Sequence, residues 1–198
     1  MWVVKLGGSL NADPLLPGWL EVIARHGAGR VVLVCGGGTF ADAVRHSQAQ
    51  WQFDDLAAHN MALLAMVQTA HLLRALNPAL HLLSDERAIA PALAAGRSVL
   101  WSPQALLAER AGPDTNWDAT SDSIALALAH RLGAQRLVVV KSCHVDPSSS
   151  LGELSRAGVI DRRFESLAQA HQVPVVFMHK AEAAGLQSML LGGDSRPA

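Results

Sequence analysis

The stretch Val3-Val4-Lys5-Leu6-Gly7-Gly8-Ser9 lies near the start of the 198-residue chain and joins an apolar run to a pair of glycines. Branched apolar residues favour a buried strand, and the glycines predict a tight turn at its carboxyl end. Because glycine has no Cβ, the backbone amides of such a turn can approach an anion, and a following helix would add its N-terminal partial charge. We expect a phosphate site with Lys5 as a mobile point charge. The alternative is an ordinary strand-to-helix turn with a surface lysine.

A second glycine turn, Gly36-Gly37-Gly38, follows the apolar run from Val31 to Cys35. Parallel strands place their carboxyl ends at one edge of the sheet, so both turns should lie at the edge where such folds bind ligands. Two neighbouring anion turns suit a transfer reaction with phosphate on both sides of the transferred atom. The spacing fits neither GxGxxG nor GxxxxGK[ST], which disfavours a nicotinamide enzyme and a P-loop protein.

Short apolar runs alternate with longer amphipathic segments along the chain, which is typical of a parallel sheet covered by helices on both faces. The strand candidates are Val3 to Leu6, Val31 to Cys35, His81 to Leu83, Ser98 to Trp101, Leu137 to Lys141 and Val175 to Met178. The helix candidates are residues 15–23, Thr39 to Gln50 and Asp55 to Leu76, with further helices after Ser102-Pro103 and Ser121-Asp122. Turns or loops are expected at Gly112 to Thr120 and Pro147 to Gly152, and a frayed tail at Gly192 to Ala198. The length suits one domain, residues 1–198, of the α/β class.

The composition points to a soluble protein with a small-molecule substrate. A formal net charge of −1 disfavours nucleic acid as the partner, and no unbroken apolar run is long enough for a membrane helix. The N-terminus lacks the sections of a secretory signal, so we expect a cytoplasmic protein. Cys35 and Cys143 adjoin predicted strands and are expected to be buried thiols. The group Cys143-His144-x-Asp146 is a poor metal cluster because neighbouring residues at a strand end rarely point to one centre.

The segment from Trp117 to Ala125 leads into an alanine-rich helix, which is followed by the strand that ends at Lys141. Asp122 falls in the first turn of this helix. It is either a partner of the helix dipole or an ionic anchor for Lys5. Lys141 is either a ligand-binding group at the sheet edge or a strand-end lysine that reaches solvent.

The order KLGGS, then strand plus GGG, then S-D-x-x-A heading a helix and a strand, resembles the amino acid kinase superfamily. That superfamily includes acetylglutamate, uridylate, aspartate and isopentenyl phosphate kinases. The resemblance covers most of the chain and implies a three-layer α/β/α sandwich with a mostly parallel central sheet. It also implies the use of ATP and of Mg²⁺ held mainly by the phosphates, with no dedicated metal ligands on the protein.

The resemblance implies roles for the residues of this chain that match functional positions of the superfamily. Lys5 matches a phosphate-binding lysine, and Asp122 matches the aspartate that orients it. The residues expected to hold ATP and its phosphates are Gly7, Gly8, Ser9, Lys141, Ser142 and Asp146. The loop Gly36 to Gly38 matches the acceptor side.

One element of the superfamily is missing. Larger members carry a late GGM-x-x-K element that supplies a second lysine, and this chain has none. The candidates for a second cation are Arg162, Arg163 and Lys180. An arginine could offset the same charge with a different geometry.

The shortened plan, with Cys35 to Arg45 and Ala58 to Ala62, resembles a compact branch of methanogens and methylotrophs. Its kinase phosphorylates the monophosphate of an aminomethyl-furanmethanol in methanofuran biosynthesis. Arg45 is placed to grip an acceptor phosphate. The residues that could hold an ammonium group and a small ring are Asp42, Trp51, Phe53, His59 and Trp117. The alternatives are a surface pair of Asp42 with Arg45, and aromatic residues placed in the core or a subunit interface.

We therefore expect ATP-dependent phosphoryl transfer to a small acceptor that already carries a phosphate. A carboxylate or nucleoside monophosphate acceptor remains open, as does a non-catalytic nucleotide- or oxyanion-binding protein like the superfamily's metal-storage relatives. The long helix from Asp55 to Leu76 carries more apolar surface than one face of a monomer usually buries, so a homodimer or higher homo-oligomer is expected.

Overall fold

The computed structural model describes residues 1–192, so the expectation of a frayed tail falls outside the described residues except at Gly192. Within them, one sheet of six parallel strands runs in the order β3-β4-β2-β1-β5-β6. The strands are β1 (Trp2–Leu6), β2 (Val31–Cys35), β3 (His81–Leu83), β4 (Val99–Trp101), β5 (Arg136–Lys141) and β6 (Val175–His179). All six predicted strands are confirmed. The all-valine and leucine interior of β5 is buried on both faces, as expected for a central parallel strand.

The helices connect these strands. They are α1 (Leu16–His26), α2 (Gly38–Trp51), α3 (Asp55–Leu76), α4 (Ile89–Ala94), α5 (Ser121–Arg131), α6 (Leu151–Arg156), α7 (Phe164–His171) and α8 (Ala183–Leu190). Three short 3₁₀ segments are η1 (Gly8–Ala12), η2 (Glu86–Ala88) and η3 (Pro103–Leu106). The helix predicted after Ser102-Pro103 is only η3. Ser150, inside the predicted loop at 147–152, forms a capping box with Glu153, so α6 begins at Leu151 and the last two residues of that predicted loop are helical.

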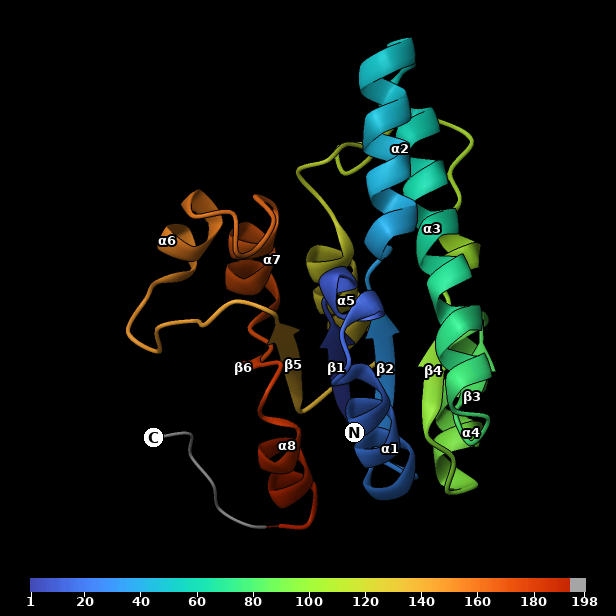
Figure 1. The fold of residues 1–198 in the computed structure, drawn as a ribbon, viewed down its shortest axis with the longest axis vertical. Coiled ribbons are helices and arrows are strands. Elements are labelled where there is room, and N and C mark those ends of the chain that lie inside the picture. The colour runs from blue at the N-terminus through green and yellow to red at the C-terminus, as the bar shows by residue number, and fades with distance from the viewer. Residues whose placement is uncertain (193–198) are drawn as a thin grey trace.

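Two hydrophobic clusters cover the two faces of the sheet and give the predicted three-layer sandwich (Figure 1). On one face, side chains of α4, α5 and α7 pack on alternate valines of the central strands. On the other, α1 and α8 pack around the fully buried Trp19. Both faces are apolar, so the carboxyl edge of the sheet is left for polar chemistry.

By length and composition, α3 is the one helix among residues 1–192 that could cross a membrane. Its Leu63, Met66 and Leu73 are buried in the two core clusters, which explains its apolar character by its place beside the sheet. Figure 1 shows α2 and α3 rising together past the ends of the strand arrows, with α6 and α7 on the opposite side of that edge. The site lies between these groups.

Candidate active site

The two glycine turns lie in backbone contact at the carboxyl edge of the sheet. The amide of Gly7 donates a hydrogen bond to the carbonyl of Val140 at 3.1 Å. A Cβ on Gly36 would lie 2.6 Å from the backbone nitrogen of Gly8, and Gly38 has a φ of +54°. Only glycine suits such an approach and such a conformation. The two turns therefore form one continuous polar floor.

The helix predicted at residues 15–23 is present as α1, but it does not begin directly behind the first glycine turn. Gly8 begins the short 3₁₀ segment η1, and α1 starts only at Leu16. The segment that follows Gly7-Gly8 in sequence therefore supplies no α-helix N-terminus at that turn. The second turn differs, because Gly38 is itself the first residue of α2.

A buried polar link that the sequence did not reveal supports the second turn. Asn11 Nδ2 donates to Thr69 Oγ1 at 3.1 Å, and Thr69 Oγ1 donates to the carbonyl of Gly37 at 3.3 Å. Thr69 is fully buried on α3. The link ties η1, α3 and the turn together, and its members are too far apart in sequence for a local motif to mark them.

Lys5, Asp122 and Lys141 form a buried ionic cluster behind this floor. Lys5 Nζ lies 2.6 Å from Asp122 Oδ1, and Lys141 Nζ lies 2.6 Å from Asp122 Oδ2. The three side chains are 3%, 6% and 12% exposed for Lys5, Asp122 and Lys141. The contact expected between Lys5 and Asp122 is present, while the contact of Lys141 with the same carboxylate was not foreseen. Two ammonium groups share one carboxylate, so the cluster carries a net charge of about +1.

The pKa values of the cluster reflect this arrangement. Burial by itself raises the pKa of Asp122, but the charges and hydrogen bonds of Lys5 and Lys141 outweigh it and hold that pKa below the usual value. Burial lowers the pKa of Lys141, and repulsion from Lys5 lowers it further against the attraction of Asp122. Asp122 is therefore ionised at neutral pH, and Lys141 is destabilised in its charged form.

Asp161 fixes the start of α5 from a distant segment. Its carboxylate accepts hydrogen bonds from the amide and hydroxyl of Thr120 at 2.9 and 2.8 Å, and from the amide of Ser123 at 3.0 Å. It also accepts from the hydroxyl of Ser123 and from the amide of Phe164. A carboxylate at this position stabilises the helix N-terminus. Asp161 thus holds Asp122 in place indirectly, a role that no local sequence signal indicates.

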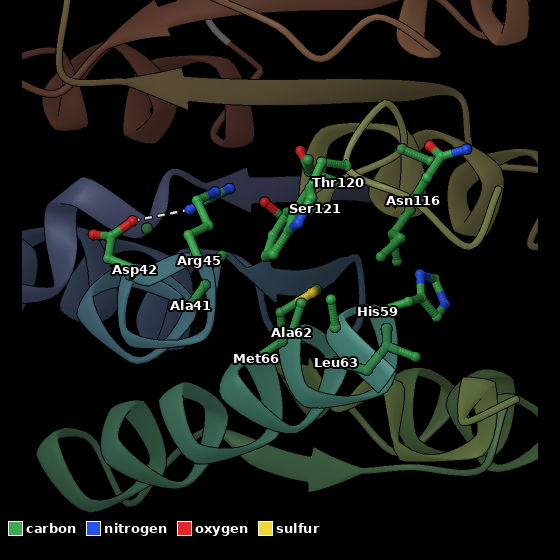
Figure 2. A pocket seen from close by; sticks show the side chains of 18 of the residues that line it. Ala41, Asp42, Arg45, His59, Ala62, Leu63, Met66, Asn116, Thr120 and Ser121 are labelled. Carbon is green, nitrogen blue, oxygen red and sulfur yellow. Dashed lines mark hydrogen bonds and ion pairs between the residues drawn. The ribbon is translucent and has the colours of Figure 1, made fainter. Parts of the chain in front are cut away.

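One pocket, about 270 Å³ in volume, lies between α2, α3 and the residues before α5. Seven of the nine residues proposed for the acceptor side line it: Gly36, Gly37, Gly38, Asp42, Arg45, His59 and Trp117. Figure 2 shows Thr120 and Ser121 facing Ala62, Leu63 and Met66 across it. Trp51 and Phe53 do not line it, and Trp51 is exposed, so the structure does not bring these two together with the other seven.

His59 contributes a polar edge to this pocket. Burial lowers the pKa of His59, partly opposed by the charge of Asp114. The imidazole is therefore mainly neutral at pH 7 and offers a hydrogen bond without a full charge.

Trp117 packs against α2 through contacts with two of its residues. The guanidinium of Arg45 lies 4.3 Å from the centre of the Trp117 ring, and the indole N–H donates to Gln48 Oε1 at 2.6 Å. Arg45 also contacts Asp42 at 2.9 Å, the surface pair foreseen as an alternative. Its remaining donors stay free for a ligand, since this pair uses Nη1 alone among the contacts of the described residues.

A second pocket, larger and more open at about 910 Å³, lies between the start of α5, the end of β5 and residues 155–162. Asp122 and Lys141 line this second pocket, whereas Ser121 lines the first. Arg45 and Trp117 line both. The N-terminus of α5 therefore stands between two pockets, with the ionic cluster at their boundary.

Several residues expected to touch ATP do not line either pocket. They are Lys5, Gly7, Ser142 and Asp146, whereas Gly8 and Ser9 line the first pocket and Lys141 the second. Ser142 Oγ accepts a hydrogen bond from Ser9 Oγ at 3.0 Å, which joins the first turn to the end of β5. Asp146 accepts hydrogen bonds from the amide and hydroxyl of Ser148 within its loop.

The cysteines are free, as expected, but only one is buried. Burial raises the pKa of Cys35 to about 12, which makes it an inert core thiol. Cys143 is exposed, because it follows β5 into the loop, so the prediction that it is buried is wrong.

The three candidates for a second cation are engaged away from Asp122. Lys180 Nζ pairs with Asp13 at 2.7 Å, and Arg163 Nε lies 2.8 Å from Asp114 Oδ1. Arg162 lines the second pocket but is 81% exposed and lies 3.4 Å from Asp118. Of these three, only Arg162 borders either pocket.

Residues 1–192 hold no group of three histidine, cysteine, aspartate or glutamate side chains that could bind a metal ion. Both oxygens of Asp122 face ammonium groups. These residues therefore do not form a dedicated Mg²⁺ cage, and a magnesium ion that arrives with a nucleotide would be held by its phosphates.

Comparisons with known proteins agree with this fold. Residues 1–144 match the Amino acid kinase family. The fold is similar to UMP kinase from Bacillus anthracis (TM-score 0.71, 16% identity, 98% of this chain and 96% of that chain). It is similar to uridylate kinase from Archaeoglobus fulgidus (TM-score 0.69, 16% identity, 96% and 95%) and to aspartate kinase from Synechocystis (TM-score 0.67, 16% identity, 91% and 38%). No curated protein matches the chain by sequence.

Proposed function

The chain belongs to the amino acid kinase family, and we propose that it transfers the γ-phosphoryl group of ATP to a small acceptor. The observation that carries this proposal is the buried Lys5–Asp122–Lys141 cluster at the boundary of two pockets. A phosphoryl group that moves between a donor and an acceptor needs positive charge at the point of transfer. A cluster with a net positive charge at that boundary supplies it.

The larger, polar second pocket suits the nucleotide, and the smaller first pocket suits the acceptor. In the step, an acceptor oxygen forms a bond to the γ-phosphorus while the bond to the β–γ bridging oxygen breaks, and ADP leaves with the electron pair. The amides of Gly8 and Gly36–Gly38 orient the phosphates, and the cluster offsets their charge. No general base is required if the nucleophile is an anionic phosphate oxygen.

A phosphomonoester with a small ring is the proposed acceptor. The free donors of Arg45 suit its phosphate, the ring of Trp117 offers a flat wall, and Asp42 offers a partner for an ammonium group. Aminomethyl-furanmethanol phosphate, a precursor of methanofuran, combines these three features. The volume of about 270 Å³ suits a molecule of this size.

Three further properties complete the proposal. The reaction takes place in the cytoplasm with Mg²⁺ bound to ATP. The protein acts as a homodimer or higher homo-oligomer, because Met61 and Leu64 leave apolar surface exposed along α3. Sedimentation that finds only monomer at micromolar concentration would contradict the oligomer.

The test is a transfer assay with MgATP and a panel of acceptors, read by ³¹P NMR. The panel holds aminomethyl-furanmethanol phosphate, simple alkyl phosphates, UMP, aspartate and glutamate. We expect a new diphosphate signal with the furan phosphate. A product with UMP or a carboxylate would assign a different acceptor. Tight ATP binding without product from any member would favour a non-catalytic binding protein.

A further inference from the structure

The buried cluster contains more positive charge than its own stability requires. Lys5 and Asp122 already form a matched pair at 2.6 Å, with both side chains almost fully buried. Lys141 adds a second ammonium group to the same carboxylate. Burying a charge without a counter-ion costs free energy, and the lowered pKa of Lys141 is consistent with that cost.

The nearest further carboxylate does not balance this charge. Asp161 attracts Lys141, yet its oxygens accept five hydrogen bonds from Thr120, Ser123 and Phe164, and no ion pair joins it to Lys141 among the described residues. Among residues 1–192, Lys141 forms no ion pair beyond the carboxylate it shares with Lys5, so an anionic ligand would balance its charge. The second pocket, which Lys141 lines, is where an anion would reach it.

Of the two lysines, Lys141 is the one that reaches open space. Its side chain is 12% exposed and borders the second pocket, while Lys5 is 3% exposed and borders neither pocket. Lys180 and Arg163 are held by Asp13 and Asp114. Lys141 is therefore better placed than either of them to meet a phosphate at the cluster.

We propose that Lys141 is a catalytic residue that contacts the transferred phosphoryl group, with Asp122, itself paired with Lys5, holding its ammonium in position. This inference rests on the proposed kinase function and gives it a second cation. As the bond from the γ-phosphorus to the bridging oxygen breaks and the bond to the acceptor oxygen forms, Lys141 offsets negative charge on the phosphoryl oxygens. It donates hydrogen bonds and keeps its proton throughout.

The test compares Lys141→Ala and Lys141→Arg with Lys180→Ala and Arg163→Ala, the variants that remove the competing cations. Each is assayed for kcat, KM for ATP, thermal unfolding, and binding of ADP with and without aluminium fluoride, a mimic of the phosphoryl group in transfer. We expect Lys141→Ala to lower kcat by roughly a hundredfold to a thousandfold, as for loss of one preorganised donor. Its ADP affinity should stay near the wild-type value, while the extra affinity given by aluminium fluoride is lost. Its Tm should not fall, since the Lys5–Asp122 pair remains matched.

Lys141→Arg should recover part of kcat because it restores the charge with another geometry. The proposal is overturned if Lys141→Ala keeps kcat within a factor of about three of wild type. It is also overturned if the variant loses affinity for ADP alone and for ADP with aluminium fluoride by the same factor. A large loss in Lys180→Ala or Arg163→Ala, with Lys141→Ala active, would move the role to that residue. Wild-type protein without transfer to any acceptor would defeat the kinase function itself, which is a separate result.

Discussion

A Cβ on Gly36 would lie 2.6 Å from the backbone nitrogen of Gly8, so the two glycine turns touch through their backbones. Leu6 and Cys35, which precede the turns, are paired in register between β1 and β2. The register of two parallel strands thus brings both turns to one place. Their contact makes each turn depend on the other.

Gly36→Ala is expected to disturb both turns. The added methyl group meets the backbone of Gly8, which cannot move aside as a flexible side chain would, so we expect a loss of about 1–3 kcal/mol in the free energy of unfolding. Urea denaturation and the transfer assay measure the two effects. Gly18→Ala is the matched control, because its Cβ meets nothing within 4 Å and a helical alanine should be neutral or stabilising. Equal behaviour of the two variants would count against the contact.

Asp122→Asn is expected to destabilise the fold strongly, because it leaves two buried ammonium groups without a counter-ion. Loss of one partner of a buried ion pair costs about 3–5 kcal/mol. The folded-state pKa of Asp122 is lowered, so its contribution is complete above the unfolded value and is lost as the pH falls through the folded value. The difference from wild type in urea denaturation should therefore be full at pH 7 and shrink below about pH 4.

Asp42→Asn serves as the control for that experiment. Its pair with Arg45 is largely exposed, so the loss in unfolding free energy should stay below about 1 kcal/mol. If Asp122→Asn costs no more than this control at pH 7, the cluster does not stabilise the protein.

The rate of transfer should fall on the alkaline side at a lower pH than an ordinary lysine would give. Burial and repulsion from Lys5 lower the pKa of Lys141, while Asp122 and Asp161 oppose the shift. The protonated form of Lys141 is needed in the proposed step, so kcat should decline as the pH rises through this lowered pKa. In Lys141→Arg the decline should move to higher pH, because arginine keeps its proton. Profiles that coincide for the two proteins would contradict the assignment.

Arg45→Ala is expected to weaken binding of the acceptor more than binding of the nucleotide. Loss of a charged hydrogen bond of about 1.5–3 kcal/mol corresponds to a rise in the acceptor KM of roughly ten- to a hundredfold. Arg45→Lys keeps the charge but lacks the planar guanidinium, so its acceptor KM should lie between those of wild type and Arg45→Ala. Steady-state kinetics with each substrate varied in turn measures the split. A larger change in the KM for ATP would place Arg45 on the donor side.

Local patterns were sufficient to predict the strands, the two glycine turns and the long helix α3. The runs of valine and leucine leave no polar face, which is enough to predict buried strands. The pair Asn77-Pro78 directly follows the last residue of α3, so the end of this helix can also be predicted from adjacent residues. Seven residues of the first pocket were named from the sequence, but its lining also includes residues of α3 and of the segment before α5 that were not, such as Met66 and Thr120.

Contacts across long sequence distances were not predictable in this way. The carboxylate of Asp161 reaches the start of α5 from about 40 residues away, and Asn11 meets Thr69 from 58 residues away. Lys141 was expected to bind the nucleotide, and only the order of strands β1 and β5 shows that it shares Asp122 with Lys5. The helix predicted at residues 15–23 is confirmed as α1, but the 3₁₀ segment η1 separates it from the first glycine turn, so the sequence pattern placed its N-terminal charge too close to the glycines.

The most direct test of the central claim is transfer from γ-³²P-labelled MgATP to a small phosphomonoester by wild-type protein and by Lys5→Ala. Lys5 is the most deeply buried side chain of the cluster, and its ammonium group pairs with Asp122. We predict labelled diphosphate product with wild type, and a loss of kcat of roughly a hundredfold or more in the folded variant. Circular dichroism establishes that the variant is folded. Near-normal transfer by folded Lys5→Ala would contradict the claim that phosphoryl transfer takes place at the Lys5–Asp122–Lys141 cluster.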